Sequence, residues 1–500
     1  MVDEQDYDIV GPRADALMES LRATGYSLPD AIADIIDNSL AAHARNVWLT
    51  FYWAGSISSI SIVDDGLGMT CPVLVNSMRM GSQSPLDERA LSDLGRYGLG
   101  MKTASISQAR SLTVASRFSG NSEINIRRWD LDHIAKVKDW HLLRSATEEG
   151  ISRLSVLEHL SHGTVVVWEK LDRLVGEASA SNVKSRRHFL DAVKSVEDHI
   201  AMVFHRYMIG PKAVTFWIND QRVNAWDPFL SDHPATQRLA SEELGSVGSR
   251  VKVEPYVLPH HTHMTAEQHF AASGPAGWNA QQGFYVYRNR RLLLAGDWLG
   301  LGYKKEEHYK LARILVDLPN SLDHEWEIDV RKSKARPPLV LRDELNRIAR
   351  VTRERAVTVY RHRGKTIARG AQASPIFVWQ SRVRGQRLSY VINREHPLIK
   401  EALQAGTIDT STLNRLLRLI EEYIPVKQVW VDAADGDEKQ SEPFESAASE
   451  EVIEMIRMLY RAYRLNGMSH TEARGCLVST EAFGDRYELI EDAIGNLEEE

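Results

Sequence analysis

The sequence predicts a mixed α/β (α+β) fold divided into several domains. Its 500 residues are 43% apolar and 26% charged, which is typical of folded globular domains. At roughly 150 residues for each domain, the chain has room for about three. Helical and strand patterns also alternate along it, which indicates helices packed on sheets.

A helix followed by strands is expected near the start of the chain. Ser27 is a good helix cap, and Pro29 suits the first helical turn. Apolar residues then recur at helical spacing, as Ile32, Ile35, Ile36 and Leu40. Apolar and polar patterning predicts strands at 47–53, 60–62, 112–115, 123–128 and 164–168.

The rest of the chain divides by composition. A second α/β unit is expected after about Glu177, with strands at 214–218 and 283–287 and an arginine-rich helical stretch at 338–369. The predicted domains are 1–175, 176–370 and an α/β segment at 371–431. They are followed by a polar linker at 432–448 and an acidic helical element at 449–500.

Composition also excludes several classes of protein. Cys71 and Cys476 are the only cysteines, so neither a disulfide framework nor a multi-cysteine zinc site is expected. No apolar run approaches the eighteen or so residues of a membrane helix. The first residues are acidic rather than basic and then apolar, unlike a secretory signal. A cytoplasmic protein without a membrane partner is expected.

Charge is unevenly distributed along the chain. Residues 284–372 contain twenty Lys or Arg against eleven Asp or Glu, and residues 431–500 contain six against eighteen. Such asymmetry occurs in proteins with a nucleic-acid-facing part and an acidic tail. A solvated helix face with a solubilising tail would have the same composition, and both interpretations stay open.

Polar residues on the first predicted helix suit metal and water chemistry. Asp34 and Asn38 are four residues apart and therefore share a helix face. An amide oxygen is a suitable ligand for Mg²⁺, and a nearby carboxylate can orient a water molecule. Alone, the pair is also typical of the polar face of an ordinary amphipathic helix.

Two glycine-rich segments lie at the ends of predicted elements, one after a strand and the other before a helix. Asp64, Gly66, Gly68 and Met69 follow a strand, where a carboxylate could accept a hydrogen bond from the amine of adenine. The second segment, GRYGLGMKT at 95–103, leads into a predicted helix, whose N-terminus presents backbone N–H groups to phosphates. It is not a P-loop, because Met101 separates Gly100 from Lys102.

Taken together, these segments resemble the GHKL ATPase superfamily, which includes DNA gyrase, MutL, the 90-kilodalton heat-shock chaperone, histidine kinases and MORC proteins. The ordered set is Asp34 with Asn38, Asp64-x-Gly66-x-Gly68, Gly95-Arg96-Tyr97-Gly98-Leu99-Gly100-Met101-Lys102, and Gly163-Thr164. The phosphate segment and the strand YVYRNRRL at 285–292 are most similar to the MORC and MutL branch. The resemblance covers about residues 10–340.

The resemblance implies a Bergerat-type ATP-binding sandwich followed by a ribosomal-protein-like transducer domain and a smaller C-terminal region. ATP and Mg²⁺ are the implied cofactors. In this scheme Asn38 holds Mg²⁺, Asp64 contacts the adenine amine, and Thr164 supports that contact through water. Residues 76–97 would form a lid, and Lys332, or Lys334 close behind it, would reach the γ-phosphate. The implied nucleotide-binding set also includes Gly66, Gly68, Met69, Gly95, Arg96, Tyr97, Gly98, Leu99, Gly100, Met101, Lys102 and Thr103.

One position departs from the family pattern. The MORC and MutL relatives carry Glu where this chain has Asp34, so the carboxylate is withdrawn by one methylene, on the order of 1.5 Å. A misplacement of about 1 Å can lower a rate roughly a hundredfold. Asp34 is the expected catalytic residue, and Asp37 is the alternative, although it points elsewhere on the helix.

The favoured hypothesis is an ATPase whose nucleotide state controls homodimerisation, acting on or near DNA. A restriction-modification or phage-defence context, with other proteins of such a system as partners, follows from the resemblance alone. The alternatives are a nucleotide-gated scaffold with little hydrolysis and a chaperone-like ATPase. Four histidines, His260, His261, His263 and His269, are expected in an exposed loop rather than at a zinc site.

Overall fold

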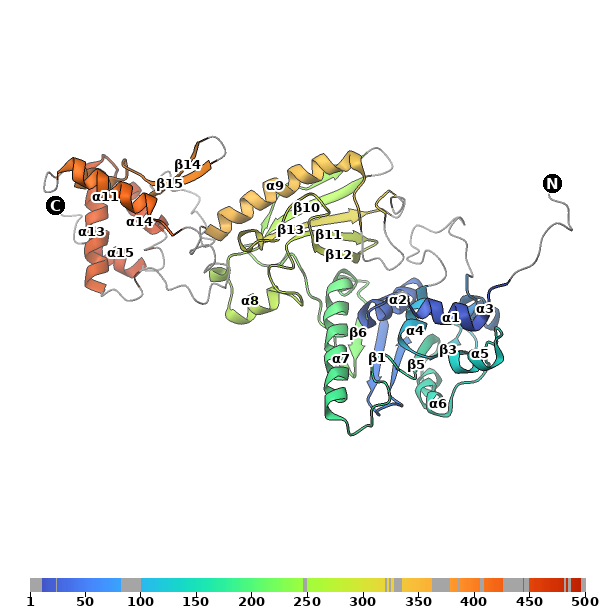
Figure 1. Ribbon diagram of the computed structural model, residues 1–500. Helices are drawn as coiled ribbons and strands as arrows, with labels where there is room; N and C mark the ends of the chain where they lie inside the picture. Colours follow the sequence, from blue (N-terminus) through green and yellow to red (C-terminus); the bar gives the residue numbers. More distant parts are fainter. Residues whose placement is uncertain are drawn as a thin grey trace, which may run out of the picture. The chain divides into compact units, whose positions relative to one another are not determined.

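The computed structural model contains two compact units. One comprises residues 1–259 and 263–357, and the other 260–262 and 358–500. The residues it describes are 11–23, 25–81, 100–245, 250–319, 322, 325–327, 335–361, 378–384, 387–404, 409–425, 444, 449–480, 483 and 487–495. The expected mixture of helices and strands is confirmed (Figure 1).

The first unit begins with a mostly antiparallel sheet. Its strand order is β4-β3-β5-β2-β1-β6-β7, and only the β1–β6 pair is parallel. The strands are β1 (Asn46–Tyr52), β2 (Ser59–Asp64), β3 (Ser111–Arg117), β4 (Ile124–Asp130), β5 (Gly163–Glu169), β6 (Thr215–Ile218) and β7 (Gln221–Arg222).

Helices cover both faces of this sheet (Figure 1). Alternate residues of β5 face opposite sides of the sheet. Val166 and Trp168 belong to the core formed with α1, α2, α4 and α7. Val165 and Val167 pack on the other face with residues of α6 and η1. The helices are α1 (Ala14–Arg22), α2 (Leu28–Ala41), α3 (Cys71–Met78), α4 (Gly100–Gln108), α5 (Leu131–Val137), α6 (Glu148–Leu154), η1 (Ser155–Glu158), α7 (Val183–Val203) and η2 (His205–Tyr207).

The strand predicted at 214–218 forms, but it belongs to the first sheet. Residues 215–218 pair in parallel with Asn46–Leu49 of β1, whereas their position after residue 175 predicts a strand of the second α/β unit. The reason is the long helix α7, which crosses back over the sheet and returns the chain to its edge. A boundary at residue 175 therefore divides this sheet.

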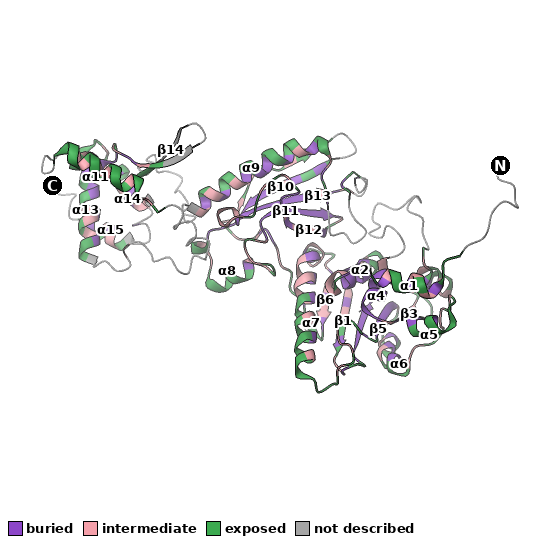
Figure 2. Cartoon of the chain, viewed as in Figure 1, coloured by how far each residue is buried: buried purple, intermediate pink, exposed green. Residues whose placement is uncertain are grey.

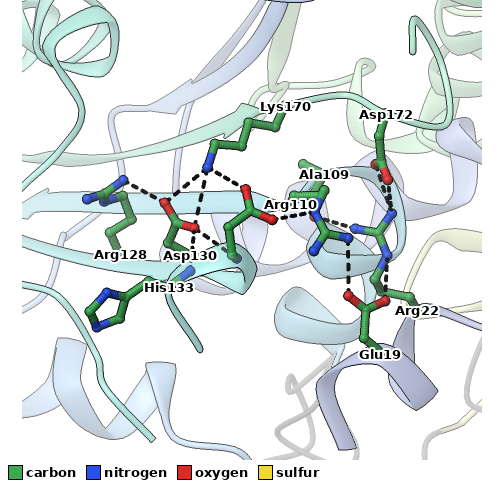
Figure 3. Close-up of polar contacts among 10 residues, drawn as sticks. Glu19, Arg22, Ala109, Arg110, Arg128, Asp130, His133, Lys170 and Asp172 are labelled. Carbon is green, nitrogen blue, oxygen red and sulfur yellow. Dashed lines mark hydrogen bonds and ion pairs between the residues drawn. The ribbon is translucent and has the colours of Figure 1, made fainter. Parts of the chain in front are cut away.

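A network of ion pairs fixes α1 at one end of the first sheet (Figure 3). Arg22 is only 3% exposed, and its guanidinium lies 2.6 Å from a carboxylate oxygen of Asp172 and 3.6 Å from one of Glu19. Arg110 lies 3.1 Å from Glu19 and 2.8 Å from Asp132. The first helix is thus held by charge as well as by its apolar face.

A second sheet completes the first unit. Its strand order is β12-β11-β13-β10-β8, with β9 also paired to β10, and β11 is buried along its whole length (Figure 2). Helix α9 lies along the sheet, and its buried residues include Leu345, Ile348 and Ala356. The elements are β8 (Gln237–Arg238), β9 (Glu242–Leu244), β10 (Val251–Val257), η3 (His261–His263), α8 (Ala266–Ala272), β11 (Gly283–Arg288), β12 (Arg291–Asp297), η4 (Glu307–Tyr309), β13 (Ala312–Leu318) and α9 (Leu339–Arg361).

The second unit has a small core of its own. Val452, Ile456 and Tyr463 of α13 pack with Cys476 and Leu477 of α14 and with Ile490 of α15. Its elements are β14 (Trp379–Arg384), β15 (Arg387–Ile392), α10 (Pro397–Gln404), α11 (Thr410–Glu422), α13 (Ser449–Leu465), α14 (His470–Ser479) and α15 (Tyr487–Ile494). Within the described ranges of both units, every helix is too short or too polar to cross a lipid bilayer.

Candidate functional site

The carboxyl group of Asp64 lies at the end of β2 in a polar socket. It is 6% exposed, and it accepts hydrogen bonds from the Ser39 hydroxyl at 2.9 Å and from the Gly66 backbone N–H at 2.9 Å. Burial raises the pKa of Asp64 to about 6, although these two hydrogen bonds oppose the shift. At neutral pH it is therefore a charged acceptor in a water-poor site.

Glycines close the wall around this socket. Gly68 has a φ of +68°, and a Cβ at this position would lie 1.9 Å from the carbonyl oxygen of Arg117. Gly163 has a φ of +149°, and its Cβ would lie 2.1 Å from the carbonyl oxygen of Asp64. Neither position has room for a side chain, so these glycines are required by close backbone approach.

Hydroxyl groups join the socket to the neighbouring strands. Thr164 pairs with Asp64 across β2 and β5, and its hydroxyl lies 3.0 Å from that of Ser116. The Ser116 hydroxyl also accepts a hydrogen bond from the Met69 N–H at 2.8 Å. His162 lies 2.7 Å, through Nδ1, from the carbonyl oxygen of Gly66 and donates to it. The turn after β2 is thus fixed from the opposite strand.

Helix α2 brings Asp34 and Asn38 to the same site. Ser27 caps the helix by accepting the Asp30 N–H, as expected, with Pro29 in the first turn. Asp34 is 5% exposed and accepts a hydrogen bond from the Tyr26 hydroxyl at 3.0 Å. Asn38 is exposed, and its Nδ2 donates to the Asp34 carbonyl oxygen at 2.9 Å.

The described part of the phosphate segment packs against this helix. Gly100 begins α4, and a Cβ built on it would lie 3.4 Å from Oδ2 of Asp34. Lys102 is 2% exposed and donates a hydrogen bond to the Ser77 carbonyl oxygen at 2.7 Å. Burial lowers the pKa of Lys102 to about 8. Met101 and Thr103 occupy the same first turn of α4.

Other predicted site residues lie outside the described residues. These are Gly95, Arg96, Tyr97, Gly98 and Leu99 of the phosphate segment, Lys332 and Lys334. Of the predicted lid at 76–97, residues 76–78 end helix α3 and residues 82–97 lie outside the described ranges.

The amide of Asn38 is suited to a divalent cation. Its Nδ2 is used within α2, so its side-chain oxygen is the ligand that remains. Among the described residues, no three or more His, Cys, Asp or Glu side chains form a cluster that could hold a metal. This donor set fits Mg²⁺, which in nucleotide sites takes few protein ligands and binds mainly phosphate and water.

Residues 26–164 match the family model described as "Histidine kinase-, DNA gyrase B-, and HSP90-like ATPase". This match supports the GHKL superfamily. It covers Asp34, Asn38, Asp64, Lys102 and Thr164, and it suggests that this segment binds ATP. The curated proteins give no match to the chain.

The arginines of α9 are largely used within the second sheet domain. The guanidinium of Arg353 lies 3.7 Å from the ring centroid of Tyr309 and 4.0 Å from that of Tyr303. Arg347 forms ion pairs with Glu242 and Glu344, and Arg355 donates to Gln237 at 2.8 Å. These contacts favour a structural role for this part of the basic stretch.

Four residues that contribute to the site are not evident from the sequence. Ser39 and Tyr26 hold the two carboxylates, and Ser116 supports the turn after β2. Arg291 on β12 reaches α2, with its Nε 2.8 Å from Oδ1 of Asp37. Arg291 lies in the segment at 285–292 that resembles the MORC and MutL branch. No sequence signal indicates its contact with Asp37, which is 254 residues away.

The prediction of an exposed histidine loop is correct only for His261, which is exposed. His260 is 5% exposed, with its ring 4.0 Å from that of His261 and 6.4 Å from that of Tyr360. His263 and His269 are half-buried, and His269 lies on α8, where its ring stacks on that of Trp278 at 4.9 Å.

Proposed function

We propose that the domain built on the first sheet binds Mg·ATP and hydrolyses it to ADP and phosphate. The observation that carries this proposal is the buried, charged Asp64 at the end of β2, held by Ser39 of α2 and bordered by Gly66 and Gly68. A buried carboxylate of this kind recognises a hydrogen-bond donor such as the 6-amino group of adenine.

Helix α2 links this socket to the phosphate segment. Ser39 contacts Asp64, and one turn earlier Asp34 faces Gly100 at the start of α4. The helix N-terminus at Gly100 provides backbone N–H groups for phosphate oxygens. Lys102, buried close by with a pKa of about 8, adds a positive charge that phosphate would stabilise.

In this proposal each side chain has a defined task. Asp64 and, through water, Thr164 select adenine, while Gly100 and Lys102 bind phosphate. Asn38 holds Mg²⁺, which when bound neutralises phosphate charge. Asp34 accepts a hydrogen bond from the attacking water and so orients it. Lys332 is proposed as the second-domain group that reaches the γ-phosphate, with Lys334 as the alternative.

The finer features of the proposal come from the resemblance to the MORC and MutL branch. They are homodimerisation controlled by the nucleotide and action on or near DNA, in a restriction-modification or phage-defence context. Arg347, Arg353 and Arg355 are used in internal contacts, and the positive charge that remains within residues 284–372 also supports a DNA partner.

Steady-state phosphate release from Mg·ATP tests this function. Wild type should release phosphate, and Asp34→Asn, which keeps the size of the side chain, should lower kcat by about a hundredfold with little change in KM. Added duplex DNA should raise the rate if DNA is the partner. ATP binding without release in the wild type would contradict hydrolysis and favour the nucleotide-gated scaffold, for which the shortened Asp34 side chain is the specific argument.

A further inference from the structure

Arg291 is a buried cation shared between the second sheet and helix α2. It is 4% exposed and begins β12. Its Nε lies 2.8 Å from Oδ1 of Asp37, and its Nη2 lies 3.9 Å from Oδ1 of Asp34. A buried guanidinium needs partners that compensate its lost hydration, and here two carboxylates supply that compensation. Both of these carboxylates come from one turn of α2.

The β11–β12 turn fixes where this cation stands. Asn289 and Arg290 both have positive φ, at +47° and +71°, as in the two-residue turns that match strand twist. The Tyr207 hydroxyl donates to the Asn289 carbonyl oxygen, and Arg290 donates to the Ile209 carbonyl oxygen at 3.2 Å. The turn is thus anchored on the segment that follows α7, and Arg291 comes directly after it.

The two carboxylate oxygens of Asp34 face different groups. Tyr26 donates to Oδ2, the oxygen that also faces Gly100, and Oδ1 is the one nearest to Arg291. Tyr26 and Asp34 both belong to the segment that matches the ATPase family, whereas Arg291 lies outside it. A group from the second sheet therefore acts on the residue proposed to orient water.

We propose that Arg291 is a positioning residue that holds α2 through Asp37 and sets the orientation of Asp34, so that the second sheet controls the hydrolytic step. This inference rests on the proposed function. If the β11–β12 turn shifts, the guanidinium leaves Asp37 and Asp34 while the Asp64 socket is untouched. Hydrolysis then depends on the second sheet, and adenine recognition does not.

The test compares kcat, KM and ATP affinity in the full-length protein. Arg291→Gln should lower kcat at least about tenfold with KM and ATP affinity within about twofold of wild type. Arg291→Lys, which keeps the charge, should recover part of the loss. Asp37→Asn should resemble Arg291→Gln, and the double variant should be no worse than either, because both act through one contact.

Arg250→Gln is the control. It removes the same charge from an exposed arginine beside β10 in the second sheet, where the guanidinium pairs with Glu243 at 2.8 Å and takes no part in the β11–β12 turn. Thermal unfolding of each variant identifies any that fail to fold, and Asp37→Asn then carries the test from the opposite side of the pair.

Three results separate the possible failures. Unchanged kcat in Arg291→Gln and Asp37→Asn, beside a wild type that turns over, overturns this inference and leaves the proposed function standing. Equal losses in Arg250→Gln and Arg291→Gln also overturn it, because they indicate a general effect of removing charge from the second sheet. A wild type that binds ATP without releasing phosphate contradicts the proposed hydrolysis. The proposed role of Arg291 in hydrolysis is then contradicted as well.

Discussion

The protonation state of Asp64 should control which nucleotides bind. Its pKa of about 6 lies above the usual 3.8 because the carboxyl is buried. Above pH 6 it is charged and accepts a hydrogen bond from an amine, and as pH falls through about 6 it is protonated and this acceptor is lost. The selectivity for adenine is therefore expected to be a property of neutral and alkaline pH.

This expectation can be measured as the ratio of ATP to ITP affinity. ITP has the same triphosphate but lacks the 6-amino group, so the titration of the phosphates cancels in the ratio. The ratio should fall about fourfold between pH 7.5 and pH 5.5, as expected for a group titrating near pH 6. A ratio that is constant over this range would show that Asp64 does not contact the base.

Some residues of the candidate site can be predicted from the sequence, and others cannot. Asp64, Gly66 and Gly68 were predicted because the turn follows a strand and its spacing resembles a family motif, and the family match covers them. Their individual roles stay predictions. Arg291 was not predicted, because its contact with Asp37 joins positions 254 apart and depends on how two sheets are arranged.

At the scale of elements, the ion pairs at α1 contribute to the stability of the first domain. Arg22 is almost fully buried, whereas Asp172 is partly exposed and can be hydrated when its partner is lost. Arg22→Met, which keeps much of the apolar stem, should lower the stability of the first domain by about 2 kcal/mol. The measurement is thermal unfolding, in which the transition of this domain should have a lower midpoint.

Lys194→Met is the control for this prediction, because Lys194 is 64% exposed and pairs with Glu197 and Asp198 on its own helix. Exposed pairs of this kind contribute about 0–1 kcal/mol. Equal effects of the two substitutions would show that the network in Figure 3 does not stabilise α1.

Local signals predicted elements well where caps and alternation were clear. Helix α2 begins directly after Ser27, the predicted cap, and the apolar residues predicted at helical spacing lie within it. Strands β3 and β5 form around the predicted ranges. The place of β6 was not predictable, because its four residues carry an ordinary strand pattern and only the return of α7 pairs them with β1.

At the scale of the molecule, the resemblance predicts that nucleotide state controls self-association. Asp34→Asn should bind Mg·ATP without completing turnover and so accumulate the ATP-bound state. Sedimentation should then give about twice the mass of the 56.5 kDa chain with Mg·ATP, and the single-chain mass without nucleotide or with ADP. The same mass under all three conditions would contradict nucleotide-gated dimerisation.

Binding of adenine by the Asp64 socket can be measured by calorimetric titration of ATP into the full-length protein. Wild type and Asp34→Asn should bind with similar affinity, whereas Asp64→Asn should bind at least about tenfold more weakly, because it loses a hydrogen bond to a charged acceptor. Thermal unfolding of Asp64→Asn verifies its fold. Equal affinity of Asp64→Asn and wild type, or no ATP binding by wild type, would contradict the proposed role of Asp64.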